Sequence, residues 1–191
     1  MTLSTDLSAR SVATGPAGRA MAQPMDSALL EGLLEHLSME RRASTAYFAL
    51  ALWFAERELR GFAAYLHAEA ATEQAHAGQL AEYLIARGQT VLLQEIPAPR
   101  QIWTSPEEAF TAIFEMESDV TTSLQQLYSM AERAGDVRTT VVLDPMVQQQ
   151  INAEDEAAHL LGRVRFARNE PAPLLILDAQ LAEDAAKATA A

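Results

Sequence analysis

The sequence contains no cysteine, few basic residues relative to its acidic ones, and no long apolar run. Without cysteine, a disulfide framework, a thiolate nucleophile and zinc or iron–sulfur sites built on thiolates are excluded. A metal ion would therefore have to bind to carboxylates and to the four histidines. No stretch approaches the ~20 apolar residues of a membrane span, and no apolar core of a secretory signal is present. We therefore expect a cytoplasmic protein without a membrane partner.

The chain has 26 acidic and 14 basic residues, which gives a net charge of −12. Nucleic acid is not expected as a partner, because contacts to phosphates require a basic face. The excess of negative charge favours cations, including metal ions.

The length of 191 residues suits one domain with a substantial core. Residues 1–24 are rich in Ser, Thr, Ala, Gly and Arg and have no periodic apolar face, which predicts a disordered N-terminal arm. An organelle transit peptide is the weaker alternative for this segment. We expect residues 25–186 to form the domain and residues 187–191 to form a tail.

From Asp26 onward, apolar residues recur at spacings of three and four, the pattern of amphipathic helices. Ser105 and Pro106 suit the N-cap and first turn of the third helix. The fourth helix begins either at Asp144, as an N-cap before Pro145, or near residue 137 with a kink at Pro145. Pro171 and Pro173 are expected to interrupt the helical pattern. The predicted helices cover residues 26–58, 61–87, 105–135, 137 or 144 to 168, and 174–186.

Residues 89–104 contain Pro97, Pro99 and Trp103 and show no helical period. Connections in compact domains usually have ~4–6 residues, whereas this one is long enough to cross a bundle from end to end. No strand is expected. The sequence therefore predicts an all-α protein, a four-helix bundle with one long crossover and a short fifth C-terminal helix.

Acidic residues occupy the apolar faces of all four long helices. Glu40 lies three residues after Leu37 and three before Ala43, so it points inward. One such acid alone would more often be a boundary residue or part of a surface ion pair. Four helices that each direct a carboxylate into one core are most economically explained by a shared cation, because buried acids repel one another. By this spacing, the inward polar residues are Glu40, Glu69, Glu73, His76, Glu117 and Glu154.

Glu73 and His76 lie at positions i and i+3, so one carboxylate and one imidazole share a helix face. The other histidines, His36, His67 and His159, fall off the apolar faces and are expected at the surface. Tyr47 is one or two turns from Glu40, and it is either a core aromatic or a redox-active residue.

Together these segments resemble the ferritins over roughly residues 26–186, and most nearly the non-haem ferritins of cyanobacteria. The proline-containing crossover and the corner at residues 143–145 are further points of similarity. The resemblance is carried by Met39-Glu40 through Tyr47, Glu69 through Glu73 and His76, Met116-Glu117, and Ile151 through Glu154.

The resemblance implies a di-iron ferroxidase centre within each subunit. Glu40 and His76 would be terminal ligands of the first iron, and Glu73 would bridge the pair. Glu117 and Glu154 would hold the second iron. Carboxylates with one imidazole suit Fe(II), and negative charge stabilises Fe(III) further.

Three more roles follow from the resemblance. Tyr47 would supply a further electron, Glu69 would form a third metal position or an exit relay, and Asp144 would line a three-fold entry channel. For Asp144 a plain N-cap is an equal alternative. Gln74 stands where a haem-binding Met would be, so no haem is expected. Ala157 stands where a second Glu-x-x-His pair would place its histidine.

The implied protein is an iron-storage ferritin. It would oxidise Fe(II) to Fe(III) with O2 and store ferric mineral in a homo-oligomeric, 24-subunit cage. One alternative is a non-storage di-iron oxidase or oxygenase, a class that usually carries two Glu-x-x-His pairs. The other is a catalytically inert bundle, in which the acidic cluster should have been lost.

Overall fold

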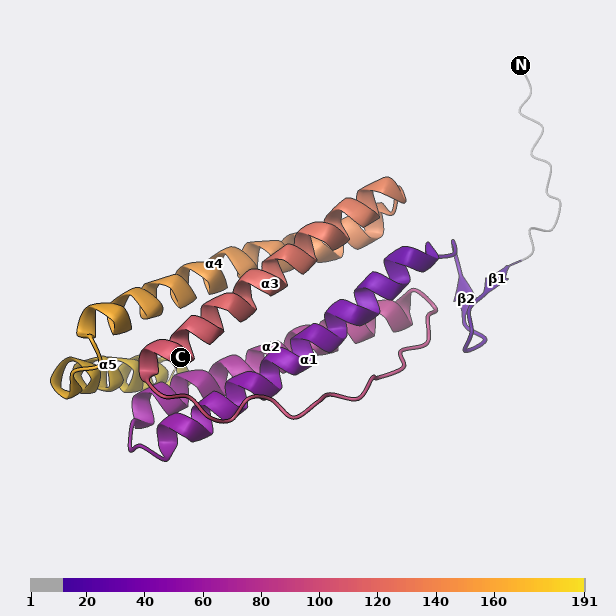
Figure 1. Cartoon of the computed structure of the whole chain (residues 1–191). Coiled ribbons are helices and arrows are strands. Elements are labelled where there is room, and N and C mark those ends of the chain that lie inside the picture. Colours follow the sequence, from indigo (N-terminus) through magenta and orange to yellow (C-terminus); the bar gives the residue numbers. More distant parts are fainter. Residues whose placement is uncertain (1–11, 191) are drawn as a thin grey trace, which may run out of the picture.

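The computed structural model describes residues 12–190, with side chains through residue 187. Four long helices form a bundle, and a fifth helix lies across one of its ends (Figure 1). Within this described part of the chain, no helix is long and apolar enough to cross a membrane. The helices are α1 (Ser27–Ala55), α2 (Arg60–Ala86), α3 (Pro106–Arg133), α4 (Val137–Ala167) and α5 (Pro171–Ala190).

The helices form two hairpins, α1 with α2 and α3 with α4, joined by the extended segment before α3 that runs along the bundle (Figure 1). This arrangement confirms the predicted four-helix bundle with one long crossover. Ser105 caps α3 by accepting a hydrogen bond from the Glu108 backbone N–H at 3.2 Å. The Glu108 carboxylate in turn accepts the Thr104 backbone N–H at 2.6 Å. The cap therefore fixes where the crossover ends.

Helix α4 begins before Pro145, so the second of the two predicted starts is correct. The Asp136 side chain caps the helix by accepting the Thr139 N–H at 3.3 Å, and Pro145 lies in the helix interior. The N-cap alternative for Asp144 is therefore wrong. Asp144 is exposed and accepts a hydrogen bond from the Tyr128 hydroxyl at 3.0 Å.

Helix α5 is longer than predicted at both ends. Pro171 and Pro173 lie in its first turn, where a missing N–H costs nothing. Its end at Ala190 includes most of the predicted tail. The helix packs against the start of α2, where Asp178 Oδ1 accepts the Phe62 N–H at 2.9 Å. Gly61 permits this approach, because a Cβ there would lie 1.7 Å from the Asp178 carbonyl oxygen.

A two-stranded hairpin precedes α1, where no strand was expected. Strand β1 (Ala13–Thr14) pairs antiparallel with β2 (Ala20–Met21). Gly15 lets it approach the end of α2, because a Cβ there would lie 1.9 Å from the Gly88 carbonyl oxygen. Such short strands carry no periodic signal. The expected arm over residues 1–24 thus differs from the structure at this hairpin, and residues 1–11 lie outside the described part.

The apolar core falls into two clusters along the bundle. One is rich in aromatic residues and includes Tyr47, Phe54, Phe62 and Phe110. The other is rich in leucine, with Leu33 and other leucines from α1, α2, α3 and α4. Between these two clusters lies one buried acidic residue on each of α1, α2 and α3, namely Glu40, Glu73 and Glu117, and on α4 the buried residue at this level is Gln150. The polar layer is therefore enclosed by apolar packing on both sides.

The spacing of apolar residues on α4 predicts that Val147, Ile151, Ala158 and Leu161 form its buried face, and this prediction is partly wrong. Ile151 is 56% exposed and Ala158 is also exposed, whereas Gln150 and Ala157 are buried. The true face is turned by one residue, about 100° on a helix. Glu154 is consequently only half-buried.

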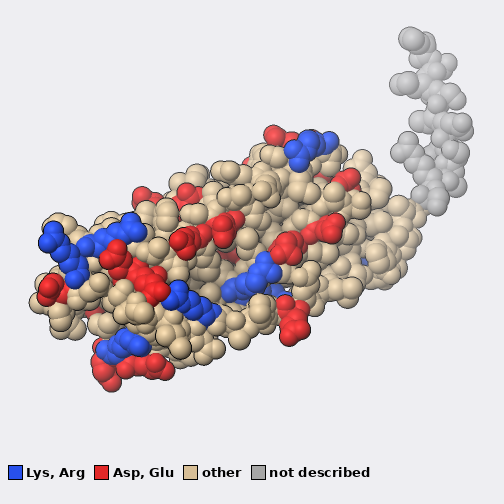
Figure 2. Space-filling view, in the orientation of Figure 1, with Lys and Arg blue, Asp and Glu red and all other residues tan. Residues whose placement is uncertain are grey.

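On the surface, acidic and basic side chains are intermixed over the face shown in Figure 2. On this face the acidic residues do not gather into a single patch. The acids that matter for chemistry are those in the interior.

Candidate metal centre

The predicted inward acids come from all four long helices. Glu40 of α1 is 1% exposed, Glu73 of α2 is 4% exposed, and Glu117 of α3 is 2% exposed. His76 and Glu154 are partly buried. Periodicity along each helix places these side chains on the inner face, because residues three or four apart share a face. The structure thus confirms that Glu40, Glu73 and Glu117 point inward, whereas Glu154 is only half-buried.

Three of these side chains converge on one point. Glu40, Glu73 and His76 each offer a ligand atom, and the three atoms lie within 4.8 Å of one another. His76 Nδ1 is 3.2 Å from Glu73 Oε2 and 4.0 Å from Glu40 Oε2. Among the described residues, the buried Glu40 Oε2 has no hydrogen-bond partner. A buried carboxylate oxygen without a partner destabilises the fold. Two carboxylates and an imidazole are suitable ligands for a cation, and a bound cation would stabilise the unpartnered oxygen.

The acids of α3 and α4 are held differently. Glu117 accepts hydrogen bonds from the Tyr47 hydroxyl and from Gln150 Nε2, the latter at 2.9 Å. Glu154 accepts a hydrogen bond from the Thr121 hydroxyl. These two carboxylates therefore already have protein partners.

The electrostatics of the cluster favour a bound cation. Burial raises the pKa of Glu40 and of Glu117, and it raises the pKa of Glu73 to about 7. The hydrogen bond to Glu73 raises the pKa of His76. Desolvation disfavours the ionised carboxylates, and a bound cation would reverse that preference.

A cavity of about 300 Å³ opens beside the cluster. Its lining includes Glu73, His76, Tyr47, Glu69 and Glu156. Burial raises the pKa of Glu69 to about 7. The structure thus places Glu69 on the same cavity as two of the convergent residues.

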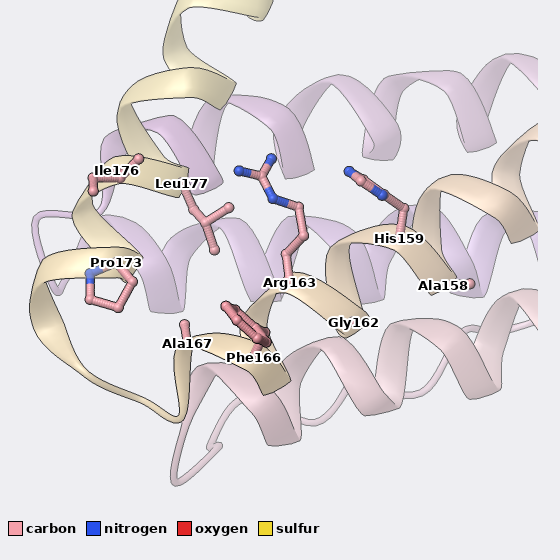
Figure 3. Close-up of a pocket in the computed structure, with 9 residues that line it drawn as sticks. All are labelled: Ala158, His159, Gly162, Arg163, Phe166, Ala167, Pro173, Ile176 and Leu177. Carbon is pink, nitrogen blue, oxygen red and sulfur yellow. The ribbon is translucent and has the colours of Figure 1, made fainter.

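A second cavity, of about 560 Å³, lies between the end of α4 and α5 (Figure 3). Its nine lining residues are mainly apolar, and none is a carboxylate. His159 is at its edge and is exposed, as predicted, and His67 is exposed too. This cavity lacks the ligands of a metal centre.

Asp144 does not join the cluster. It lies ten residues before Glu154 on α4, about 15 Å along the helix axis at 1.5 Å per residue. A role at a channel between subunits stays a prediction.

Two residues of the polar layer were missed or misplaced by the sequence analysis. Gln150 is buried and holds Glu117. His36 was expected at the surface, but it is 0% exposed, and its Nε2 lies 3.0 Å from Glu40 Oε1. The available signal was its spacing of four from Glu40, which puts both on one helix face. Burial lowers the pKa of His36 to about 4, so its imidazole is neutral near pH 7.

Comparison with known proteins gives a family. A ferritin-like domain model matches residues 30–167. The bacterial non-haem ferritin of Bacteroides fragilis strain 638R is 26% identical over 155 residues, which cover 81% of this chain and 96% of that protein. The bacterial non-haem ferritin of Campylobacter jejuni is 31% identical over 134 residues, which cover 70% of this chain and 80% of that protein.

Solved structures give the same result. The open-pore ferritin of the hyperthermophilic archaeon Archaeoglobus fulgidus matches with a TM-score of 0.81 and 26% identity, over 83% of this chain and 98% of that one. An iron-soaked variant of the ferritin PmFTN matches with a TM-score of 0.78 and 31% identity, over 81% of this chain and 98% of that one. The fold, the matched domain and the relatives agree, and this chain belongs to the ferritin family.

Proposed function

We propose that this ferritin oxidises Fe(II) to Fe(III) with O2 at a di-iron ferroxidase centre inside the bundle and stores the ferric product. The observation that carries the proposal is the convergence of Glu40, Glu73 and His76 within 4.8 Å, around a buried carboxylate oxygen that lacks a hydrogen-bond partner among the described residues. The iron-soaked relative supports iron as the metal.

In this proposal, Glu40 and His76 are terminal ligands of the first Fe(II), and Glu73 bridges to the second. Glu117 and Glu154 hold the second Fe(II). Two Fe(II) ions give one electron each to O2, and the carboxylates stabilise the more highly charged Fe(III) product. His76 donates no negative charge, so the charge of the site comes from four acids on four helices.

Tyr47 is the proposed source of a further electron. A phenol that loses an electron also loses its proton, and the Tyr47 hydroxyl already donates to Glu117. Burial raises the pKa of Tyr47 well above its ordinary value, so the group stays protonated until it is oxidised. The hydrogen bond thus gives the proton an acceptor.

Glu69 is proposed as a third metal position or an exit relay, because it lines the cavity beside Glu73 and His76. Asp144, on the exposed side of α4, is proposed to line an entry channel of a 24-subunit cage. The shell is proposed to work in the cytoplasm, and Gln74 predicts a centre without haem.

A non-storage di-iron oxidase or oxygenase is less well supported. Its usual second Glu-x-x-His pair would need a histidine three residues after Glu154, and the residue there is Ala157, which is buried. The relatives named above are ferritins.

Two measurements test the function. Size-exclusion chromatography should show a large cage, and a small species would contradict storage. Addition of two Fe(II) per chain in air should give rapid ferric absorbance. Glu40→Ala should lose this phase, and Glu82→Ala, an exposed acid on α2, should keep it. Equal rates in both variants would refute the proposed centre.

A further inference from the structure

His36 is a buried imidazole that the proposed centre does not use. It lies on α1 one turn before Glu40 and is 0% exposed. Its Nε2 approaches Glu40 Oε1 at 3.0 Å, and its Nδ1 is 2.7 Å from Ser123 Oγ on α3. The side chain therefore lies between the carboxylate of a proposed iron ligand and a hydroxyl of another helix.

The contact with Glu40 is not a hydrogen bond. Despite the distance of 3.0 Å, Nε2 has no hydrogen-bond partner among residues 12–187, and the second oxygen of Glu40, Oε2, also has none. Two buried polar atoms without partners on adjacent turns are unusual. Both atoms carry a lone pair that can bind a metal ion, so one ion could serve as the partner of both.

The distance suits two ligands of one metal ion. With metal–ligand bonds of about 2.1 Å, two ligand atoms at 90° around an ion lie about 3.0 Å apart. The Nε2–Oε1 distance therefore suits an ion between these two atoms. His36 lies outside the group whose ligand atoms are within 4.8 Å of one another, so its ring or the Glu40 carboxylate must shift for His36 to share the ion with Glu73 and His76.

The other ring nitrogen fits the same role. A ligating histidine almost always uses its second nitrogen to bond a nearby acceptor, which fixes the tautomer and the ring orientation. If Nδ1–H donates to Ser123 Oγ, the lone pair of Nε2 is left for a metal.

We propose that His36 Nε2 is a further ligand of the metal position formed by Glu40, Glu73 and His76. This inference rests on the proposed ferroxidase centre and adds a second imidazole to it. Imidazole binds divalent first-row metals well, whereas carboxylates favour harder ions. A second imidazole would therefore tighten the hold on the divalent ion before oxidation.

The direct test is a crystal structure of the full-length protein soaked with Zn²⁺, a divalent ion that does not react with O2. We expect an anomalous peak about 2.1 Å from His36 Nε2, the usual Zn–N distance. A peak bound to Glu40, Glu73 and His76 but more than about 3 Å from His36 would overturn the inference and leave the centre intact.

Calorimetric titration with Zn²⁺ tests the same point in solution. His36→Leu keeps the apolar bulk and should weaken the first binding event by more than the ~10–100-fold that loss of an outer contact costs. His36→Gln should be equally weak, because its amide is a poor ligand. If His36 only positioned Glu40, Gln would restore binding, since its amide can donate to a carboxylate.

Two control variants separate the possible failures. His67→Leu removes an exposed histidine of α2 and should bind Zn²⁺ normally. Glu73→Ala should lose binding at the first position. If Glu73→Ala binds Zn²⁺ more weakly and His36→Leu does not, this inference is wrong and the proposed centre stands. If neither variant binds Zn²⁺ more weakly, the proposed centre is wrong as well.

Discussion

The two halves of the proposed centre are prepared differently for a metal ion. On α1 and α2, Glu40, Glu73 and His76 converge, and one carboxylate oxygen lacks a partner among the described residues. On α3 and α4, Glu117 and Glu154 already accept hydrogen bonds from neighbouring side chains. A cation entering the first half replaces one hydrogen bond, between His76 and Glu73, and gives the unpartnered Glu40 oxygen a partner. A cation at the second half must replace hydrogen bonds on both carboxylates.

If two ions bind as proposed, this difference predicts that the bundle holds them with unequal strength. Both halves use carboxylates, so ligand type alone does not distinguish them. The free energy of metal binding depends also on what the ligands contact beforehand. We therefore expect the first position to fill before the second, and the following predictions test this order.

The largest effect should come from Glu73→Ala, which removes the proposed bridge between the halves. The rate of ferric absorbance after addition of two Fe(II) per chain should fall by more than the ~10–100-fold that loss of an outer contact costs. Both halves lose a ligand, so neither fills normally. A rate within a few-fold of the unmodified protein would show that the bridge is elsewhere.

Glu117→Ala should damage only the second half. Zn²⁺ titration should fall from two bound ions per chain to one, and the first binding event should keep its affinity. Glu115→Ala, which removes an exposed acid on the same helix, is the matched control and should bind two ions. Loss of both ions in Glu117→Ala would mean that the halves do not fill independently.

Gln150→Leu should alter the second half more gently. It removes the 2.9 Å hydrogen bond that orients Glu117, and loss of such an outer contact typically changes metal affinity by ~10–100-fold. We expect a weaker second Zn²⁺ event and an unchanged first one. Gln148→Leu, at an exposed position of α4, provides the comparison. A change confined to the first event would reverse the assignment of the halves.

The stability of the metal-free protein should depend on pH, because ionised Glu73 is buried in the first half of the centre. Burial raises the pKa of Glu73 from 4.5 to about 7 in the folded state. A carboxyl with a raised folded pKa destabilises the protein as pH rises from about 4.5 to 7, because only the unfolded chain ionises freely there.

Glu73→Gln should therefore raise the Tm of the metal-free protein by several degrees at pH 8 and leave it nearly unchanged at pH 4. A difference of about 2–4 °C per kcal/mol is typical for a domain of this size. Glu82→Gln is the exposed control on the same helix. A Tm gain that is the same at both pH values would show that ionisation of Glu73 is not its source.

Tyr47→Phe should have the smallest effect on binding. It removes one hydrogen bond to Glu117, a loss of about 1 kcal/mol in stability. Both Zn²⁺ events should remain. A tyrosyl radical signal that forms after Fe(II) and O2 are mixed should disappear, while Tyr65→Phe, in the same cavity, should retain it. A signal that persists in Tyr47→Phe would remove this residue from the mechanism.

Much of the centre was predictable because helical periodicity fixes the direction of each side chain. Glu40, Glu73 and Glu117 were each assigned to the interior from apolar neighbours three and four residues away, and all three are buried. The method failed on α4, where Ala157 and Ala158 are adjacent and their apolar character does not show which of them is buried. It also misplaced His36. This residue was assigned to the surface although it lies four residues before the inward Glu40, a spacing that puts both side chains on one helix face.

Periodicity and capping residues are enough to predict the helices, the crossover, the cap of α3 at Ser105 and the inward direction of most acids. Only the tertiary structure decided which acids converge and which are held by Tyr47, Gln150 and Thr121. Periodicity sets the direction of a side chain around one helix axis, but it does not set the height of one helix against another. That height depends on packing between hairpins joined by a long crossover, and so the unequal halves appear only in three dimensions.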